Sequence, residues 1–313
     1  VSILPGISSV SYMAAAVGET YSDAYICSIH GVKLSNITSR ISHHAKTFML
    51  MSGVKDVNML GHLLSSDERY GLQKCSVTVG YQLSYPDETI LQLSPQECTK
   101  LKREGLYICM IKNPNPVAKN VTPQLSDAAF IREKVPMTKE EVRWVSVARL
   151  GVQPGDTVWD VGAGTGAVTF ELARKAMDGA VFAVERNTEA IELIAQNRQK
   201  LGGFNVHIVQ GHAPEVLADL PKPNCVFVGG SGGNMREIIE TALEKNPKAR
   251  IVVNAIALET LQETQRLFAE FGLQQVEITQ LSAARGKSIG CYTMMTANNP
   301  VFILSGKGDK NGE

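Results

Sequence analysis

The chain has 313 residues, of which 44% are hydrophobic and 20% charged, a composition typical of a soluble globular protein with about two domains. Lysine and arginine together number 31, as do aspartate and glutamate, so the basic excess needed to bind a phosphate backbone is missing. No apolar run approaches the ~18 residues of a membrane span, and the first residues do not resemble a signal peptide. We therefore expect a cytoplasmic protein that acts on neither nucleic acid nor membranes.

The six cysteines are scattered and include no Cys-x-x-Cys pair, so neither a disulfide framework nor a zinc site is predicted. The adjacent His43 and His44 have no carboxylate or cysteine at ligand spacing. We expect free thiols and no bound metal.

Near the start of the chain, Ser8 or Ser9 precedes an apolar run at Val10–Val17 and is a candidate N-cap for a helix there. A lone histidine, His30, follows a strand-like run, a position that is more often structural than functional. Three prolines and three asparagines between Lys112 and Pro123 predict a linker. We expect one domain over residues 1–120 and a second over residues 121–313.

In the second domain, strand-like and helix-like runs alternate, which predicts a parallel sheet with helices on both faces. The expected strands are 156–161, 180–184, 206–209, 225–228 and 250–255, and the expected helices are 139–150, 167–177, 188–201, 234–245 and 258–271. The runs 274–282 and 288–296, joined by 283–287 and followed by 300–304, predict an antiparallel edge. The polar tail from Ser305 is expected to fray.

The most informative stretch is Val158-Trp-Asp-Val-Gly-Ala-Gly-Thr-Gly166, an apolar strand that runs into three alternating glycines. Gly162, Gly164 and Gly166 permit a tight turn and a close approach of a ligand to the backbone. A helix follows at Ala167–Met177, and the N–H groups at its start suit a carboxylate or phosphate. The order of strand, glycine turn and helix predicts a loop that binds a cofactor.

Two cofactors fit this loop, because Gly162-Ala-Gly-Thr-Gly-Ala167 also satisfies the relaxed fingerprint of a dinucleotide site. Glu185, at the end of the second strand, suits the ribose hydroxyls of either cofactor. Asp160 favours S-adenosylmethionine, since a carboxylate beside the loop suits a ligand with an amino group and a sulfonium.

Several motifs of the second half occur in a fixed order, which is Asp127–Arg143, the glycine loop, Gly211-His-Ala-Pro214, Val226–Gly233 and Val253–Thr260. Over roughly residues 125–304 they resemble, in the same order, the precorrin methyltransferases that act on carbon 15 in cobalamin synthesis. It implies methylation of carbon 15 of a precorrin, with loss of carbon dioxide from the acetate on ring C. It also implies S-adenosylmethionine as cofactor and a homo-oligomer, a tetramer in that family. We expect a class I S-adenosylmethionine-dependent methyltransferase domain with a Rossmann-like α/β fold.

The resemblance and the position of each residue suggest roles around the cofactor. Backbone N–H groups of the loop Gly162, Ala163, Gly164, Thr165 and Gly166 are expected to hold its methionyl end, with Asp160 beside them. Glu185 is expected to bind the ribose, and His212 with Ala213 to border the adenine, although His212 also fits an ordinary surface loop. Thr138 either contacts the ligand or caps a helix in a capping box with Glu141.

On the substrate side, Gly230, Ser231 and Gly232 follow the fourth strand and are expected to line the tetrapyrrole. The cations Arg132, Lys139 and Arg285 are candidates for pairing with the substrate's carboxylates, although each also fits a solvated surface charge. Asn254, at the end of the fifth strand, either contacts substrate or caps its turn. No catalytic acid or base stands out, and alignment of donor and acceptor is expected to carry most of the effect.

The first half resembles the precorrin methyltransferases that act on carbon 5, through Leu4–Ser9, Ser28-Ile-His-Gly31 and Tyr85-Pro-Asp-Glu88. That resemblance implies a partial tetrapyrrole methylase (class III) α/β domain. The family's glycine-rich loop has no counterpart downstream of Val1, and the chain does not begin with methionine. We therefore expect a fragment in which the N-terminal lobe is absent and methylation at carbon 5 is incomplete.

Two other interpretations stay open. A class I methyltransferase acting on transfer RNA has similar core motifs, although the balanced charge disfavours it. Alternatively, the N-terminal half is a module without catalytic activity that docks or assembles the enzyme, since half of a two-lobed fold would expose core surface unless it were paired.

Overall fold

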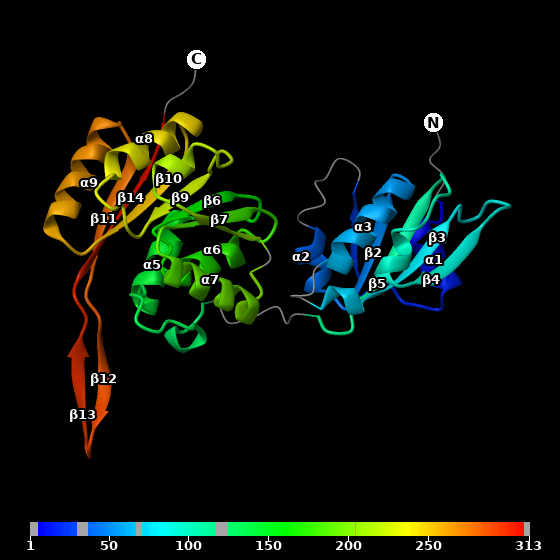
Figure 1. Cartoon of the computed structure of the whole chain (residues 1–313), viewed down its shortest axis with the longest axis horizontal. Coiled ribbons are helices and arrows are strands. Elements are labelled where there is room, and N and C mark those ends of the chain that lie inside the picture. The colour runs from blue at the N-terminus through cyan, green and yellow to red at the C-terminus, as the bar shows by residue number, and fades with distance from the viewer. Residues whose placement is uncertain (1–5, 30–36, 67–70, 117–123, 204, 310–313) are drawn as a thin grey trace. The chain divides into compact units, whose positions relative to one another are not determined.

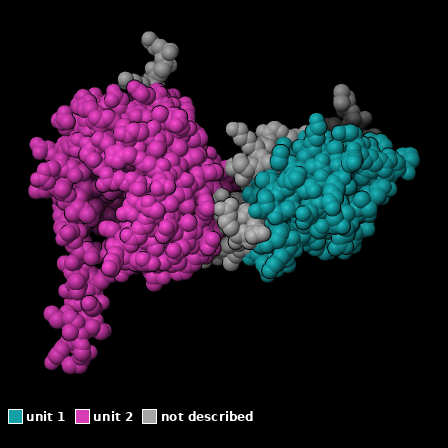
Figure 2. Space-filling model, viewed as in Figure 1, with its two compact units in different colours: residues 1–121 teal, residues 122–313 magenta. Residues whose placement is uncertain are grey.

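The computed structural model describes residues 6–29, 37–66, 71–116, 124–203 and 205–309. Leu4, Pro5, His30 and Gly31, which belong to the motifs named above, lie outside these ranges. The chain divides into unit 1, Val1–Val121, and unit 2, Thr122–Glu313, each with its own sheet and core (Figure 1 and Figure 2). No helix among the described residues is both long and apolar enough to cross a membrane.

Unit 1 is built on a five-stranded sheet in the order β1-β2-β5-β3-β4. Only β1 and β2 pair in parallel, and the other neighbours are antiparallel. The Ser8 side chain accepts a hydrogen bond from the amide of Ser11, so the predicted N-cap is confirmed at Ser8. The strands are β1 (Tyr25–Ser28), β2 (Lys46–Met51), β3 (Ser76–Tyr81), β4 (Thr89–Leu93) and β5 (Tyr107–Lys112), and the α-helices are α1 (Ser9–Ala16), α2 (Ile37–Ser42), α3 (Val54–Ser66) and α4 (Pro95–Cys98).

Unit 2 contains a seven-stranded sheet in the order β11-β14-β10-β9-β6-β7-β8. The five strands from β6 to β10 are parallel, as their alternation with helices predicts. The chain starts in the middle at β6, proceeds outward through β7 and β8, and then returns to β9 on the other side of β6. The strands are β6 (Thr157–Val161), β7 (Ala180–Glu185), β8 (Val206–Gln210), β9 (Cys225–Val228), β10 (Arg250–Ala255), β11 (Gln274–Leu281) and β14 (Val301–Lys307).

Helices cover both faces of this sheet. Successive strand residues point to opposite sides, and the apolar ones pack in a separate core on each side. On β6, Val158 packs in the core beneath one set of helices and Trp159 in the core beneath the other. The first set is α5 (Glu140–Leu150), α6 (Ala167–Lys175) and α7 (Thr188–Leu201), and the second is α8 (Met235–Lys245) and α9 (Leu258–Glu270).

The C-terminal strands differ from the prediction in their pairing. The antiparallel edge forms, but β11 pairs with β14 and not with the residues that directly follow it. Those residues form β12 (Ala284–Ile289) and β13 (Tyr292–Ala297), a separate hairpin that we call the arm and that stands clear of the rest of unit 2 (Figure 1). Residues 283–287 are therefore not the expected turn, which lies at Gly290 with a φ of 61°. Ser305 to Lys307 complete β14, so they do not belong to a frayed tail.

Candidate functional site

A cavity of about 630 Å³ lies in unit 2 at the carboxyl ends of the parallel strands, where the strand order reverses between β6 and β9. Open α/β sheets bind their ligands at this kind of switch point. The structure brings together there most of the residues that the sequence suggested. They are Thr138, Lys139, Asp160, Gly162, Ala163, Gly164, Thr165, Glu185, His212, Ala213, Gly230, Ser231, Gly232 and Asn254, whereas Gly166, Arg132 and Arg285 do not line the cavity.

The glycine loop after β6 touches the loop after β9. Gly162 has a φ of 76°, and a Cβ atom placed on it would lie 2.7 Å from the backbone nitrogen of Gly230. A side chain at position 162 would therefore meet backbone that cannot move aside as a flexible side chain would, in a conformation that other residues rarely adopt. Glycine at 162 is required by this close approach and by the turn together.

The loop's own amides are largely committed within the protein, which corrects the expectation that they hold the ligand. Gly162 and Ala163 donate to the carbonyl of Val184, at 3.0 and 3.1 Å, and Gly166 donates to the carbonyl of Ala163 at 2.8 Å. Gly164 donates to Oε2 of Glu185 at 2.9 Å. The amides suited to an anionic ligand group are those at the start of α6, because the first N–H groups of a helix have no intrahelical acceptor. Ala167 and Val168 occupy that position and line the cavity.

The Glu185 carboxylate is held in place at the end of β7 by backbone amides. Its Oε1 accepts from the amides of Arg186 and Asn187, both at 2.9 Å, while Oε2 accepts from Gly164. Each carboxylate oxygen has two acceptor sites, so Oε2 keeps one for a ligand hydroxyl after its bond to Gly164.

Asp160 is fully buried beneath the loop and lines the cavity. Its Oδ2 accepts from the hydroxyl of Thr169, whereas Oδ1 has no hydrogen-bond partner among the described residues. The hydroxyl oxygen of Thr165 is buried in the same unpartnered way. The pKa of Asp160 is raised to about 7, chiefly by burial; the hydrogen bond from the Thr169 hydroxyl opposes this shift and the charge of Glu185 adds to it.

These two oxygens test whether a methionine-type cofactor fits the site. Buried polar atoms normally find a hydrogen-bond partner, so Asp160 and Thr165 call for a polar ligand group beside the glycine loop. An ammonium group can donate to Oδ1 of Asp160 and favours the ionised carboxylate. The residues present therefore fit the amino group of S-adenosylmethionine.

His212 lies between two charged neighbours at the rim. Its Nδ1 is 3.2 Å from the Glu215 carboxylate, and its Nε2 is 3.3 Å from a guanidinium nitrogen of Arg186. Sequence reasoning missed Arg186, although it directly follows Glu185 and lines the cavity. It also missed Asn298 and Asn299, which line the cavity from the loop between β13 and β14. Only the arm's return to the sheet brings these two asparagines to the site.

The capping box predicted for Thr138 and Glu141 is not formed. The N-cap of α5 is Lys139, and no side chain caps this end. The Glu141 carboxylate instead binds Arg285, which it reaches at 2.6 and 2.8 Å. The carbonyl of Thr138 accepts from Arg143 at 2.7 Å, and Thr138 and Lys139 both line the cavity.

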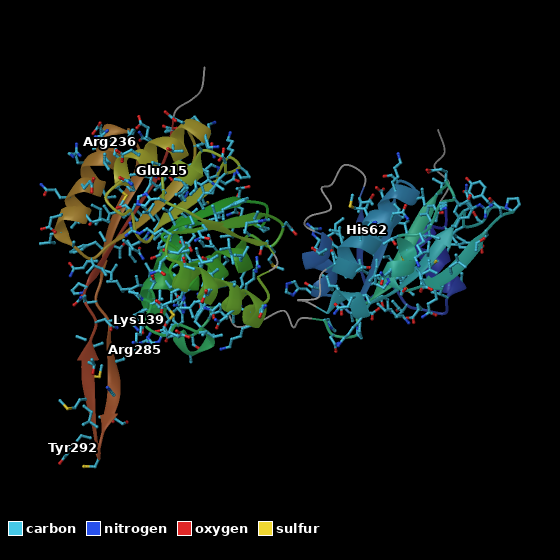
Figure 3. All side chains as sticks on the ribbon, in the orientation of Figure 1. His62, Lys139, Glu215, Arg236, Arg285 and Tyr292 are labelled. Atoms are coloured by element: carbon cyan, nitrogen blue, oxygen red, sulfur yellow. The ribbon has the colours of Figure 1, made fainter. Side chains whose placement is uncertain are left out.

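Arg285 lies at the base of the arm, where its guanidinium already has carboxylate partners. It pairs with Asp127 at 3.0 Å and Glu140 at 3.2 Å in addition to Glu141. Figure 3 shows Lys139 on the body of unit 2, Arg285 at the base of the arm and Tyr292 at its tip. A guanidinium matched by three carboxylates is not available to bind the substrate's acids, so the structure does not support that role for Arg285. Arg132 is exposed and lies outside the cavity lining.

At the far side of the cavity, Asn254 follows the buried part of β10. Its side-chain oxygen lies 2.9 Å from the hydroxyl of Ser146 on α5. Ile256 also lines this side and is 63% exposed, so the wall offers an apolar surface beside polar amides. Such a wall suits a large ring system with polar substituents.

Unit 1 has a second, smaller cavity of about 390 Å³. Ser9 and Tyr85, which belong to motifs far apart in the sequence, both line it. Close by, the hydroxyl of Tyr12, three residues after the first of these motifs, donates to Glu88 of the second at 2.8 Å. Within the described parts of both units, His, Cys, Asp and Glu residues nowhere gather in a group of three or more that could hold a metal ion.

The comparison with known protein families agrees with this geometry. The model of the precorrin methyltransferase domain family matches residues 128–307, which include every strand that borders the cavity. The chain belongs to this family.

Individual relatives match the same part of the chain. A probable cobalt-precorrin-6B C(15)-methyltransferase (decarboxylating) from Pyrobaculum calidifontis is 44% identical over 187 residues, which are 59% of this chain and 95% of that protein. The corresponding Salmonella typhimurium enzyme is 34% identical over 189 residues, 60% of this chain and 97% of that protein.

Solved structures show the same extent of similarity. A precorrin-6Y C5,15-methyltransferase from Geobacter metallireducens matches with a TM-score of 0.56 and 36% identity, over 58% of this chain and 97% of that one. A precorrin-8W decarboxylase from Methanobacterium thermoautotrophicum matches with a TM-score of 0.55 and 39% identity, over 58% of this chain and 99% of that one. The matched length is close to that of unit 2. Membership of the family favours a precorrin substrate over transfer RNA, and S-adenosylmethionine over a dinucleotide cofactor.

Proposed function

We propose that unit 2 methylates carbon 15 of a precorrin and decarboxylates the acetate on ring C of the same substrate, as a step of cobalamin synthesis. The observation that carries this proposal is the extent of the family match. It spans the cavity at the switch point and the segment before α5 that lines it. The relatives are named for methylation at carbon 15 and for decarboxylation, which agrees with this pair of reactions.

S-adenosylmethionine supplies an activated methyl group when it is bound. Glu185 accepts hydrogen bonds from the ribose hydroxyls, and Oδ1 of Asp160 accepts one from the amino group. The N-terminal amides of α6 face the carboxylate, and His212 with Ala213 borders the adenine. These residues act by alignment, because transfer of a methyl group to an electron-rich carbon is a direct displacement.

The substrate occupies the side of the cavity formed by the loop after β9 and by Asn254. Lys139 lines this cavity and pairs with one of the substrate's carboxylates. In the decarboxylation the carbon–carbon bond to the carboxylate breaks, carbon dioxide leaves, and its electron pair passes into the conjugated ring. A proton taken up at the methylene carbon completes a methyl group.

The test is to incubate the full chain with S-adenosylmethionine and a late precorrin and to measure product mass. One added methyl group together with the loss of carbon dioxide supports the proposal. An unchanged substrate, in a chain that binds the cofactor, contradicts it. Parallel assays with cobalt-containing and cobalt-free substrate distinguish the two forms of the precursor.

For unit 1 we propose the C-terminal part of a tetrapyrrole methylase domain. Ser9 and Tyr85, which come from two of the motifs, line one cavity, and this supports the assignment. The same mass measurement separates the two activities, because methylation at carbon 5 would add a second methyl group. A single added methyl group is the expected result.

We also propose that the chain forms a homo-oligomer through the arm, a tetramer being what the family resemblance implies. Tyr292 is 73% exposed and Met295 68% exposed on a two-stranded hairpin, a structure that is marginally stable when isolated. Light scattering on the variant with Tyr292→Ser and Met295→Ser should show a smaller assembly. Lys287→Gln, a polar change on the same arm, is the control and should leave the mass unchanged. Equal masses for both variants would rule out the arm as the contact.

A further inference from the structure

The cavity is bordered by a stretch of chain that contains little regular structure of its own. Residues 124–139 include one short 3-10 helix, Asp127–Ala129, and otherwise turns and irregular backbone. Five consecutive residues at the end of this segment, 135–139, line the cavity. Residues 135–139 thus form one wall of the cavity, and the position of this wall depends on side chains outside the cavity that bind segment 124–139.

Asn197 on α7 is one of these side chains, and it is fully buried. Its Oδ1 accepts from the amide of Ile131 at 2.8 Å, and its Nδ2 donates to the carbonyl of the same residue at 2.8 Å. Nδ2 also donates to the carbonyl of Thr165 at 3.0 Å. One amide thus ties segment 124–139 to the glycine loop, and both of its N–H groups have an acceptor.

This arrangement explains an asparagine inside a helix, where that residue type is unfavourable because it competes for backbone hydrogen bonds. Asn197 does not line the cavity, so it has no direct contact with a ligand there. It acts on Thr165, which lines the cavity, and on Ile131, four residues before the part of the segment that lines it.

Other side chains anchor the same segment without reaching the loop. Arg143 donates to the carbonyl of Leu125 at 2.6 Å and to that of Thr138 at 2.7 Å. Glu171 accepts from the amide of Leu125 at 2.6 Å. These contacts fix the two ends of the segment, whereas Asn197 fixes its middle against the cofactor loop.

We propose that Asn197 is a positioning residue that sets the distance between the glycine loop and segment 124–139, and thereby the shape of the cofactor cavity. The inference rests on the proposed function for its effect on S-adenosylmethionine, but the tie itself is a property of the chain without ligand. Loss of the Asn197 amide leaves the partly buried backbone groups of Ile131 and the buried carbonyl of Thr165 without this partner and lets the two walls move apart.

The experiment uses the full chain with three substitutions. Asn197→Ala removes the tie. Asn197→Asp keeps the shape of the side chain and the acceptor for the Ile131 amide. It replaces the donor Nδ2 with a carboxylate oxygen, which cannot donate to the carbonyls of Ile131 and Thr165. Asn205→Ala is the matched control, because Asn205 donates to the carbonyls of Ala173 and Ala176, at 3.1 and 2.6 Å, and does not line the cavity.

Three readouts are measured at a temperature at which every variant is folded. In the ligand-free chain, hydrogen exchange of peptides covering 124–139 and 162–166 should quicken in both Asn197 variants and stay at the wild-type rate in N205A. By calorimetry, the dissociation constant for S-adenosylmethionine should rise about tenfold in N197A and change less than about twofold in N205A. The KM for S-adenosylmethionine should rise correspondingly, with a smaller change in kcat.

The results also separate this inference from the proposed function. Wild-type exchange rates in N197A, or an equal loss of affinity in N205A, would overturn the positioning role. A wild-type chain that fails to bind S-adenosylmethionine would overturn the proposed function, and the exchange measurement would still decide whether Asn197 holds the two walls together.

Discussion

The amide of Gly164 and the carboxylate of Glu185 are joined by a hydrogen bond of 2.9 Å, which links the loop after β6 to the end of β7. The residue expected to bind the ribose therefore also orients the glycine loop. Removing its carboxylate leaves the amides of Gly164, Arg186 and Asn187 without this acceptor.

We expect Glu185→Ala to weaken binding of S-adenosylmethionine by about a hundredfold, because a ligand contact and the support of the loop are lost together. Glu185→Gln, which keeps one acceptor oxygen, should lose less. Calorimetric titration checks both, and Glu192→Gln, at an exposed position of α7, is the control. An unchanged affinity in E185A would refute the ribose role.

The stability of unit 2 should depend on pH through Asp160. Burial raises the pKa of Asp160 to about 7 in the folded chain, compared with about 4 for an unfolded aspartate. Between these values the folded state binds more protons than the unfolded state, so the free energy of unfolding falls as the pH rises through this window. Asp160→Asn removes the titrating group. Its free energy of unfolding, compared with that of the wild type at the same pH, should therefore be higher at pH ~8 than at pH ~4.

Urea unfolding of the wild-type chain and D160N across that range measures the effect. Asp219→Asn, at an exposed position, is the control and should follow the wild-type curve. A constant difference between D160N and wild type at all pH values would show that Asp160 does not titrate in this window.

The affinity for S-adenosylmethionine should also depend on the ionisation of Asp160, but it should rise with pH where the stability falls. An ammonium group beside Oδ1 favours the ionised carboxylate, so affinity for S-adenosylmethionine should increase as the pH rises toward and past ~7. D160N should bind more weakly and lose this dependence. Calorimetry at several pH values checks it, and a wild-type affinity that does not vary with pH would contradict the contact.

Arg285 should contribute to stability through the carboxylates at the base of the arm. Arg285→Glu places a fourth acid beside Asp127, Glu140 and Glu141 and should lower the free energy of unfolding by about 1 kcal/mol, since the guanidinium is partly exposed. Adding Glu141→Arg to R285E should restore part of the loss. Chemical denaturation of the single and double variants measures the coupling, which would be absent if the pair did not interact.

Arg143 should matter more, because it is fully buried. Arg143→Met leaves the nearly buried Glu171 without the guanidinium 3.7 Å away and removes the donors to Leu125 and Thr138. We expect a loss of about 3 kcal/mol in the free energy of unfolding. Arg149→Met, which breaks an exposed pair with Glu277, is the control and should lose less than about 1 kcal/mol. Similar losses in both variants would contradict the importance of burial.

The parts of the site that were predictable from the sequence depend on local pattern. The glycines at 162 and 164 require positive φ, and Glu185 ends a strand whose apolar run is plain, so both could be placed before any contact was known. The capping box predicted for Thr138 and Glu141 does not form, although the two residues have the spacing that it requires. A distant residue, Arg285, offers the Glu141 carboxylate a stronger, charged partner.

Other features depend on contacts between distant parts of the chain. The arm and the β11–β14 pairing could not be derived from hydrophobic alternation, because the same runs fit either a local hairpin or a long-range pair. Asn197 lies 66 residues from Ile131, and nothing in its own helix indicates which distant residue it contacts. Asn298 and Asn299 reach the cavity only because the arm returns the chain to β14.

The close approach of Gly162 and Gly230 joins the side of the cavity that we propose for the cofactor to the side that we propose for the substrate. One loop leaves the central strand and the other leaves its neighbour β9, where the sheet begins its second half. At this point the two backbones are in contact with no side chain between them, so we expect a shift of one loop to move the other. The contact is one-sided, because a Cβ atom on Gly162 would lie 2.7 Å from the backbone of Gly230, whereas one on Gly230 would have nothing within 4 Å. A substitution at Gly162 should therefore disturb both loops, and a variant that alters only one side of the cavity should be sought at Gly230.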